Sequence, residues 1–309
     1  TPMALVLLSN RIREKAPRTF QFFTEQGVTV KVISGDSPVT ASEVARRAGI
    51  PGAERYVDTG TLTTEQEIYE AAENYTVFGR VTPQMKKALV LAMKKRGHTV
   101  AMTGDGVNDV LAMKEADCGV AMASGAQAAS QVAQLVLTES DFAAMPAIVG
   151  EGRRVINNIQ RAASLFLVKN IMSLGVALIC IFTALPYPFQ SFNLTLIAAL
   201  TIGVPGFFLA MEPNYERVTG RFLPSVLRKA LPGGLTNVIG VVLEHLTMMR
   251  FELPQTDSAT VCTAVLAVVG MLVLYQVSVP FDTFRKVIWG AMAAALLGSF
   301  LLFGAFFEL

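Results

Sequence analysis

Hydrophobic and polar positions divide the chain into two halves with different patterns. To about residue 160, short apolar runs alternate with stretches of helical periodicity. The short runs predict strands at residues 4–8, 28–33, 76–78, 99–102, 119–122 and 135–137. Helical periodicity predicts helices at residues 11–26, 38–48, 83–96 and 110–115. This alternation is typical of an α/β domain in which helices cover a parallel sheet.

The second half consists of long apolar stretches joined by short polar segments. They are residues 165–184, 194–211, 231–249, 259–279 and 287–307. Each is close to the roughly 20 residues that cross a bilayer core. A buried core helix explains any one of them, but five in succession predict an all-α multi-span membrane domain.

The loops between these stretches differ in charge, which predicts an orientation. Basic residues follow the second and the fourth stretch: Arg217, Arg221, Arg228, Lys229, Arg285 and Lys286. The alternate joints, residues 186–192 and 251–258, carry no Lys or Arg. Because positively charged loops stay in the cytoplasm, the first half is predicted to be cytoplasmic.

Composition narrows the possible partners. The net charge is +2, and the basic loops account for it, so nucleic acid is not expected as a partner. The cysteines Cys118, Cys180 and Cys262 are scattered without a Cys-x-x-Cys pair, which predicts buried thiols rather than disulfides or zinc. The chain begins with Thr1, and no targeting segment precedes the first apolar run, so we expect the natural polypeptide to continue upstream. The odd number of predicted spans suggests a further helix downstream.

The string TGDGVND, residues 103–109, holds the strongest candidates for a functional site and directly follows an apolar run. Thr103 and Gly104 end the predicted strand, and glycine allows the chain to turn sharply there. Asp105 and Asp109 then lie near each other, and two carboxylates about 4 Å apart repel by roughly 4 kcal/mol at an effective dielectric of 20. A divalent cation removes that repulsion, and oxygen ligands beside a phosphate favour Mg²⁺. The alternative is an Asp-rich surface turn.

Two further polar loops follow predicted strands. Ser34-Gly35-Asp36 follows one strand, and residues 79–83 with Lys86 follow another. Ligands of parallel sheets bind beyond the carboxyl ends of the strands, so these loops are expected to converge on one site. There Ser34 and Gly35 would contact phosphate oxygens and Lys86 would neutralise them, a set suited to phosphoryl transfer. Alternatively, the first loop is a helix cap and Lys86 lies on a solvated helix face.

Together these motifs resemble the P-type cation-transporting ATPases. The resemblance rests on residues 34–36, the run 79–83 with Lys86, TGDGVND and residues 152–158, and it extends over about residues 4–211. It implies that residues 1–145 are part of a phosphorylation domain of haloacid-dehalogenase fold, and residues 146–309 a stalk and transmembrane domain. It also implies roles for the loops. Asp105 ligates Mg²⁺ with support from Asn108 and Asp109, Lys86 stabilises an aspartyl phosphate, and Ser34, Gly35, Asp36, Thr103 and Gly104 contact phosphate and ATP.

The family's nucleophile, an Asp in an Asp-Lys-Thr-Gly-Thr string, does not occur in this sequence. Residues 58–63 resemble that string but lack its Lys, and we interpret them as a surface turn. We therefore expect the nucleophile to lie in a missing upstream part of the same polypeptide. Residues 1–309 alone are expected neither to hydrolyse ATP nor to be labelled by it.

In related calcium and sodium/potassium pumps, two core helices supply carboxylates and amides to the transported ion. By resemblance the candidates here are Asn170, Ser173, Thr201 and Pro205. Ser173 stands where those pumps have Glu, and Ala198 and Ile202 stand at the Asn and Asp positions, so both familiar carboxylates are replaced. Pro205 still frees backbone carbonyls for a cation.

Ionisable residues in the apolar stretches are further candidates, because charge at membrane depth is costly and usually functional. Lys169 is interpreted as a built-in countercharge or pH sensor, with a snorkelling or cavity-facing lysine as the alternative. Glu212 either guards the cytoplasmic entry or faces water. Glu244 and His245 are expected at the membrane interface rather than in a ligand role.

The sequence therefore predicts the C-terminal portion of a bacterial, multi-pass cell-membrane ATPase that uses ATP and Mg²⁺. No Cys-Pro-Cys accompanies Pro205, so a hard cation is expected. Residues 201–214 most resemble a bacterial subgroup of the family that includes a mycobacterial calcium transporter, which favours Ca²⁺. Besides the cation and ATP, the expected partner of this protein is the lipid bilayer. The alternatives are a membrane-anchored phosphatase of the same fold and a catalytically inactive membrane subunit or regulator.

Overall fold

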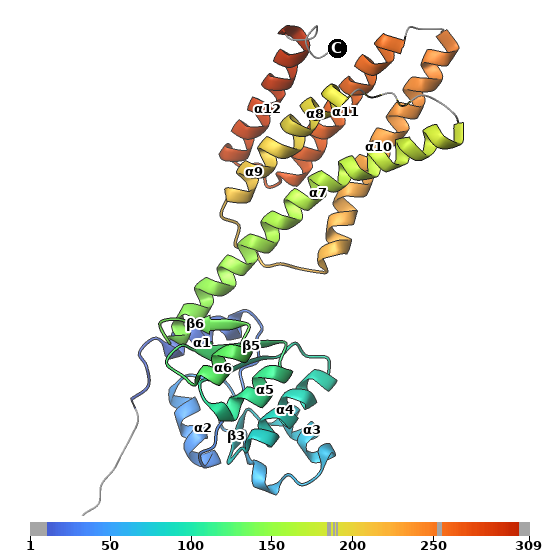
Figure 1. Cartoon of the computed structure of the whole chain (residues 1–309). Coiled ribbons are helices and arrows are strands. Elements are labelled where there is room, and N and C mark those ends of the chain that lie inside the picture. Colours follow the sequence, from blue (N-terminus) through green and yellow to red (C-terminus); the bar gives the residue numbers. More distant parts are fainter. Residues whose placement is uncertain (1–10, 184–186, 188, 190, 252–254, 303–309) are drawn as a thin grey trace, which may run out of the picture. The chain divides into compact units, whose positions relative to one another are not determined.

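A computed structural model describes residues 11–183, 187, 189, 191–251 and 255–302. The chain divides into two compact units, Thr1–Val149 and Gly150–Leu309. The strand predicted at residues 4–8 and the end of the last predicted span lie outside the described residues. Figure 1 shows strands and short helices in the first unit and long helices in the second.

The strands of the first unit form two parallel sheets, where the sequence pattern predicts a single one. One sheet has the order β1-β3-β2 and contains β1 (Val32–Ile33), β2 (Tyr56–Asp58) and β3 (Val77–Gly79). The other has the order β4-β5-β6 and contains β4 (Ala101–Gly104), β5 (Cys118–Met122) and β6 (Leu135–Leu137). Within the described residues β1 and β4 are both edge strands. Strand β2 was not predicted, because Tyr56–Asp58 lies between Arg55 and Thr59 and contains no apolar run.

Helices separate these strands along the chain. They are α1 (Ala16–Glu25), α2 (Pro38–Arg47), α3 (Glu65–Asn74), α4 (Pro83–Lys95), α5 (Val110–Glu115) and α6 (Gln127–Val132). Helices α3 and α6 were not predicted. For α3 a local signal existed, because Thr64 and Glu67 form a reciprocal capping box.

Helix α4 connects the cores beside the two sheets. Leu89 is fully buried in the cluster around β3, whereas its neighbour Val90 is buried in the cluster around β4. The side chain of Ile33 on β1 packs against both clusters. The two sheets therefore belong to one packed body, and the loops that follow their strands are held by a common core.

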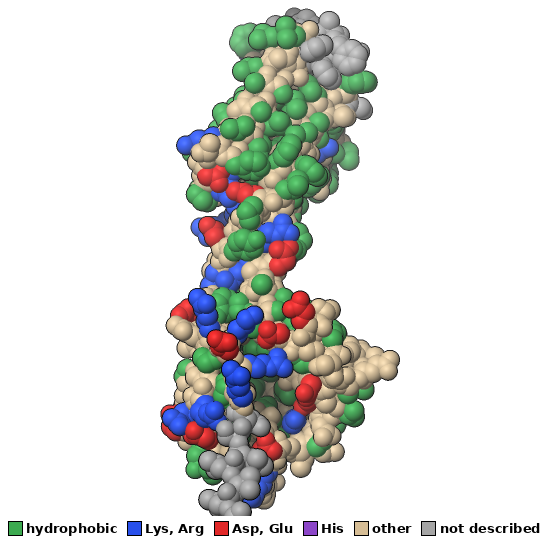
Figure 2. Space-filling view, turned by 90° about the vertical axis from the view of Figure 1, so that its left-hand side faces the viewer, with side chains coloured by type: hydrophobic (Ala, Val, Ile, Leu, Met, Phe, Trp, Pro, Cys, Tyr) green, Lys and Arg blue, Asp and Glu red, His purple; other side chains and the backbone are tan. Residues whose placement is uncertain are grey.

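The second unit consists of long apolar helices. They are α7 (Met145–Thr183), α8 (Ser191–Ala198), α9 (Val204–Met211), α10 (Phe222–Phe251), α11 (Gln255–Val277) and α12 (Thr283–Leu302). Helices α8 and α9 are joined by a π-helical segment, Ala199–Gly203, so that five candidate spans result. The space-filling view shows hydrophobic side chains over much of the surface of these helices (Figure 2). Length and composition thus fit a multi-span membrane domain.

Candidate phosphoryl-transfer site and membrane cavity

A buried ion pair occupies the centre of the predicted phosphate site. The ammonium of Lys86 lies 2.6 Å from Oδ1 of Asp109, and the two side chains are only 13% and 10% exposed. Lys86 comes from the first turn of α4, which Thr82 caps by accepting a hydrogen bond from the Met85 amide. Asp109 directly precedes α5. The structure therefore brings together two residues predicted from separate motifs, and Lys86 does not lie on a solvated face.

Glycines allow the Asp105 loop to fold closely around this pair. A Cβ atom on Gly104 would lie 2.4 Å from Cβ of Asp109, so only glycine fits there. The amide of Gly106 donates to Oδ2 of Asp109 at 3.2 Å. The carbonyl of Asp105 accepts a hydrogen bond of 2.7 Å from the Ala126 amide, which fixes the backbone of the loop.

The Asp105 carboxylate is available to a ligand. Its residue is exposed, and no hydrogen bond or ion pair is found for this carboxylate among the described residues. Asn108 is exposed beside it, and Thr103 is half-buried at the end of β4. The described residues contain no group of three or more His, Cys, Asp or Glu side chains around one point. A metal would therefore meet a small set of carboxylate oxygens, which fits Mg²⁺, since that ion keeps several waters and phosphate oxygens as ligands.

The Ser34 loop is tied to the loop after β3. The hydroxyl of Ser34 accepts a hydrogen bond of 3.1 Å from the Asp36 amide. The Arg80 amide donates to the Asp36 carbonyl at 2.7 Å, and the Val81 amide donates to the Ser34 carbonyl at 3.0 Å. Gly35 is exposed and has open space at its Cα. Two of the three predicted loops are thus joined by backbone hydrogen bonds.

Arg80 is a candidate that sequence reasoning did not single out. Its φ is +53°, an uncommon conformation for a residue with a side chain. Its guanidinium is exposed and lies 2.9 Å from a carboxylate oxygen of Asp58. A backbone outlier in a loop that follows a strand is a signal of a functional position. The local sequence carried no sign of this conformation.

The predicted turn at residues 58–63 is present and has a structural explanation. Strand β2 ends at Asp58, and a 3₁₀ turn, Thr59–Thr61, follows. The Asp58 side chain accepts a hydrogen bond from the Gly60 amide. Unlike a pure surface turn, it buries Thr59, whose hydroxyl lies 3.0 Å from the Gly79 carbonyl and 3.1 Å from that of Arg80. The segment anchors the loop after β3.

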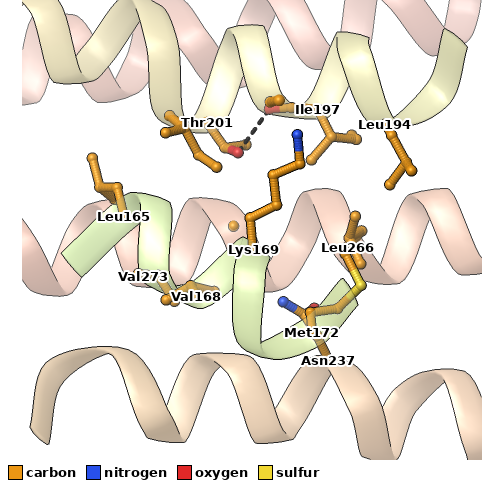
Figure 3. Close-up of a pocket in the computed structure, with 13 residues that line it drawn as sticks. Leu165, Val168, Lys169, Met172, Leu194, Ile197, Thr201, Asn237, Leu266 and Val273 are labelled. Carbon is orange, nitrogen blue, oxygen red and sulfur yellow. Dashed lines mark hydrogen bonds between the residues drawn. The ribbon is translucent and has the colours of Figure 1, made fainter. Parts of the chain in front are cut away.

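A cavity of about 30 Å³ lies between the helices of the second unit (Figure 3). Apolar side chains form most of its wall, and its polar lining residues are Lys169, Thr201 and Asn237. Lys169 extends from α7 toward the π-helical segment. The Thr201 hydroxyl donates to the Ile197 carbonyl at 2.7 Å. Asn237 was not predicted. It is 3% exposed, and its Oδ1 has no hydrogen-bond partner among the residues that the structure describes, so a polar ligand or water would satisfy it.

The other predicted transport residues lie outside the lining of this cavity. Asn170 is exposed on α7 and Ser173 is half-buried, whereas Pro205 is buried in the first turn of α9. Successive helical residues point about 100° apart, so Lys169 and Asn170 face different directions. The tertiary structure thus places Lys169, rather than Asn170, in the cavity.

Several expectations about single residues require correction. Glu212 does not face water, because its side chain is 10% exposed between two arginines. Glu244 is buried against α11, where the Cys262 thiol lies 3.1 Å from its Oε2, and its position at the membrane interface stays a prediction. Of the three cysteines only Cys262 is buried, since Cys118 and Cys180 are half-buried. Glu212 and Glu244 are buried because their partners lie on other helices, and the sequence pattern does not encode such contacts.

Comparison with known proteins places these features in a protein class. The haloacid dehalogenase-like hydrolase family matches residues 1–117. The calcium-transporting ATPase CtpE of Mycobacterium tuberculosis is 42% identical over 301 residues, which cover 92% of this chain and 37% of that protein. CtpE of Mycolicibacterium smegmatis is 41% identical, with 98% of this chain and 40% of that protein covered. The probable cation-transporting ATPase exp7 of Streptococcus pneumoniae is 39% identical, with 95% and 39% covered.

The first unit is therefore a haloacid-dehalogenase-like hydrolase domain joined to membrane-spanning helices. With relatives of this similarity over nearly all of its length, the chain belongs to the P-type cation-transporting ATPases. It spans about two fifths of the length of these relatives.

Proposed function

We propose that this chain is the C-terminal portion of a pump that uses ATP and Mg²⁺ to transport a hard inorganic cation. One observation carries the proposal: the Lys86–Asp109 ion pair is buried beside an Asp105 carboxylate that is exposed. The chain is similar over nearly its full length to proteins named as cation-transporting ATPases, which supports the same conclusion. The aspartyl phosphate would form on a segment of the polypeptide upstream of these residues.

In this proposal each residue of the first unit has a chemical task. Asp105 and Asp109 hold Mg²⁺, which neutralises phosphate charge as the phosphoryl group moves. Lys86 is fixed by Asp109 and directs its ammonium toward the phosphate oxygens. Ser34, Gly35 and Asp36 contact phosphate from the neighbouring loop, and Asn108 and Thr103 line the same side.

The transported cation would pass between α7 and the span formed by α8 and α9. Thr201 and Asn237 supply oxygens to the cavity. Pro205 has no N–H and therefore cannot donate to a carbonyl of the preceding turn. π-Helical segments such as Ala199–Gly203 are frequent at functional sites. Asn170 and Ser173 would join the site only if α7 rotates. Lys169 provides a countercharge in the absence of the cation.

Ca²⁺ is the favoured cation because two of the relatives are named as calcium-transporting. We place the pump in a bacterial cell membrane with the first unit in the cytoplasm, since the basic loops follow the second and fourth spans.

The test uses the full-length protein that contains these residues, reconstituted in lipid vesicles. We expect ATP hydrolysis and cation uptake to be stimulated by Ca²⁺ more than by Mn²⁺ or H⁺. Thr201→Val is expected to raise the Ca²⁺ concentration for half-maximal stimulation about tenfold, because it removes one ligand oxygen. Thr236→Val is the matched control: its hydroxyl also donates to the carbonyl four residues earlier, but it is exposed.

Other outcomes would replace the proposal. Hydrolysis of small phosphate esters without cation stimulation would indicate a membrane-anchored phosphatase. Absence of any hydrolysis by the full-length protein would favour an inactive membrane subunit or regulator. Equal effects of Thr201→Val and Thr236→Val would remove the cavity from the transport path.

A further inference from the structure

Glu212, at the end of α9, is held between two buried arginines from other helices. Nη1 of Arg161 on α7 lies 2.8 Å from Oε2 of Glu212. Nη2 of Arg285 on α12 lies 2.8 Å from Oε1, and Nε of Arg285 donates to both carboxylate oxygens at 2.9 and 3.0 Å. The side chains of Arg161, Arg285 and Glu212 are 7%, 6% and 10% exposed. We call these three residues the arginine clamp.

The clamp holds one more positive charge than negative, and backbone carbonyls offset the excess. Arg285 donates through Nη1 to the carbonyls of Ser278 and Pro280, just after the end of α11. Asp282 lies 3.8 Å from Arg285 at the surface. The amide of Asn158 on α7 donates to the carbonyls of Ala210 and Glu212 at 2.7 and 3.1 Å. Carbonyls at helix C-termini carry partial negative charge, which stabilises the neighbouring cations.

These contacts join four helices at a short distance from the cavity. Arg161 lies eight residues before Lys169 on α7, which is about 12 Å at 1.5 Å per residue. Leu165, one turn after Arg161, already lines the cavity. On the other side, Glu212 follows directly after α9, which continues from the segment that contains Thr201. A slide of α7 against α9 therefore separates the charges of the clamp and also changes the cavity.

We infer that Glu212 is a positioning residue: through Arg161 and Arg285 it fixes the register of α7 against α9 and so sets the affinity of the membrane cavity for the transported cation. This inference rests on the proposed pump function. Buried ion pairs contribute little net stability, but removal of one partner is strongly unfavourable, so such a cluster is suited to hold one arrangement of helices against another. Because α7 begins at Met145 and continues as one helix to Thr183, force applied at its start reaches Arg161 along the helix.

The test compares Glu212→Gln with the matched control Glu216→Gln in the full-length protein. Glu216 is an exposed carboxylate four residues further along the same loop. We expect Glu212→Gln to raise the apparent KM for the cation about tenfold and to lower the number of cations transported per ATP hydrolysed, with a change in kcat below about twofold. Glu216→Gln should leave all three quantities unchanged.

A conservative variant separates positioning from folding. Glu212→Asp keeps a carboxylate between Arg161 and Arg285 and is expected to retain most of the cation affinity lost in Glu212→Gln. Glu212→Gln with unchanged KM and unchanged cation-to-ATP ratio would overturn the inference. So would equal losses of kcat, cation affinity and thermal stability in Glu212→Gln that Glu212→Asp shares. A wild-type protein without cation-stimulated hydrolysis would instead contradict the proposed pump itself.

Discussion

The two buried charge clusters of this protein differ in what they leave unpaired. In the first unit, Lys86 and Asp109 form a one-to-one pair, and the adjacent Asp105 carboxylate is exposed. In the second, Glu212 and both arginines of the clamp are bonded to one another or to backbone carbonyls. A ligand-binding site needs a charged group without a partner in the protein, so that this group can contact the ligand. In a cluster that holds helices together, the charged groups are paired with other groups of the protein.

The largest effect that would test this contrast is expected from Asp105→Asn. If the exposed carboxylate serves Mg²⁺ and phosphate, its loss should lower phosphorylation of the full-length protein by ATP about 100- to 1000-fold, as for removal of one preorganised electrostatic group. The measurement is phosphoenzyme formation over a range of Mg²⁺ concentrations. Glu54→Gln, at an exposed carboxylate elsewhere in the unit, is the control and should leave the rate unchanged. If the Asp105→Asn variant were phosphorylated as fast as wild type, the Asp105 carboxylate would not be needed for Mg²⁺ or phosphate.

Removal of one partner from the buried pair comes next. Lys86→Met leaves the Asp109 carboxylate buried without its cation and should lower the free energy of unfolding by about 3 kcal/mol. The double variant Lys86→Met with Asp109→Asn should be less destabilised than the sum of the single variants, because no unpaired charge remains. Chemical denaturation of all four proteins measures this coupling. Additive losses would mean that the two residues do not stabilise each other.

The glycine beside the pair offers a steric test. Gly104→Ala places a methyl group 2.4 Å from Cβ of Asp109, so Asp109 must move, and we expect a loss of about 1 to 3 kcal/mol in unfolding free energy together with weaker phosphorylation. Gly152→Ala, on α7, meets no atom within 4 Å and should stabilise the helix by about 1 kcal/mol. Thermal unfolding distinguishes the expected loss of stability in Gly104→Ala from the expected gain in Gly152→Ala. A neutral Gly104→Ala would mean that the loop has room to adjust.

The smallest effect concerns pH. A hydrogen bond from the Val100 amide and the ammonium of Lys94 hold the pKa of Asp117 below its usual value. A lowered pKa contributes stability above the unfolded pKa of about 3.9, and this contribution disappears as pH falls through the folded value. Asp117→Asn should therefore be slightly less stable than wild type at pH 7, and the difference should shrink as pH falls through the folded pKa of Asp117, as measured by unfolding across pH. Asp117 is exposed, so the difference should stay small. A gap that widens in acid would contradict this account.

Sequence reasoning was most successful where a local pattern has a direct physical cause. Five apolar stretches of bilayer length correspond to the five candidate spans, and the short apolar runs correspond to most strands within a few residues. It was weaker for β2, which contains no apolar run, for the short helix α6, and for α3, whose capping box of Thr64 and Glu67 was overlooked. For Asn237 and Arg80 no local signal distinguished a cavity amide or a strained loop residue from an ordinary one.

By itself the sequence determined which parts are strand-like and which are membrane-like, because hydrophobic periodicity is a property of neighbouring residues. It also predicted, from glycine-rich turns after strands, which loops carry phosphate chemistry. Only the tertiary structure decided which charges meet. Lys86 and Asp109 are 23 residues apart, and Glu212 and Arg285 are 73 apart. Such pairs depend on how helices pack, and on a helix a step of one residue, as from Lys169 to Asn170, turns a side chain from the cavity toward the outside.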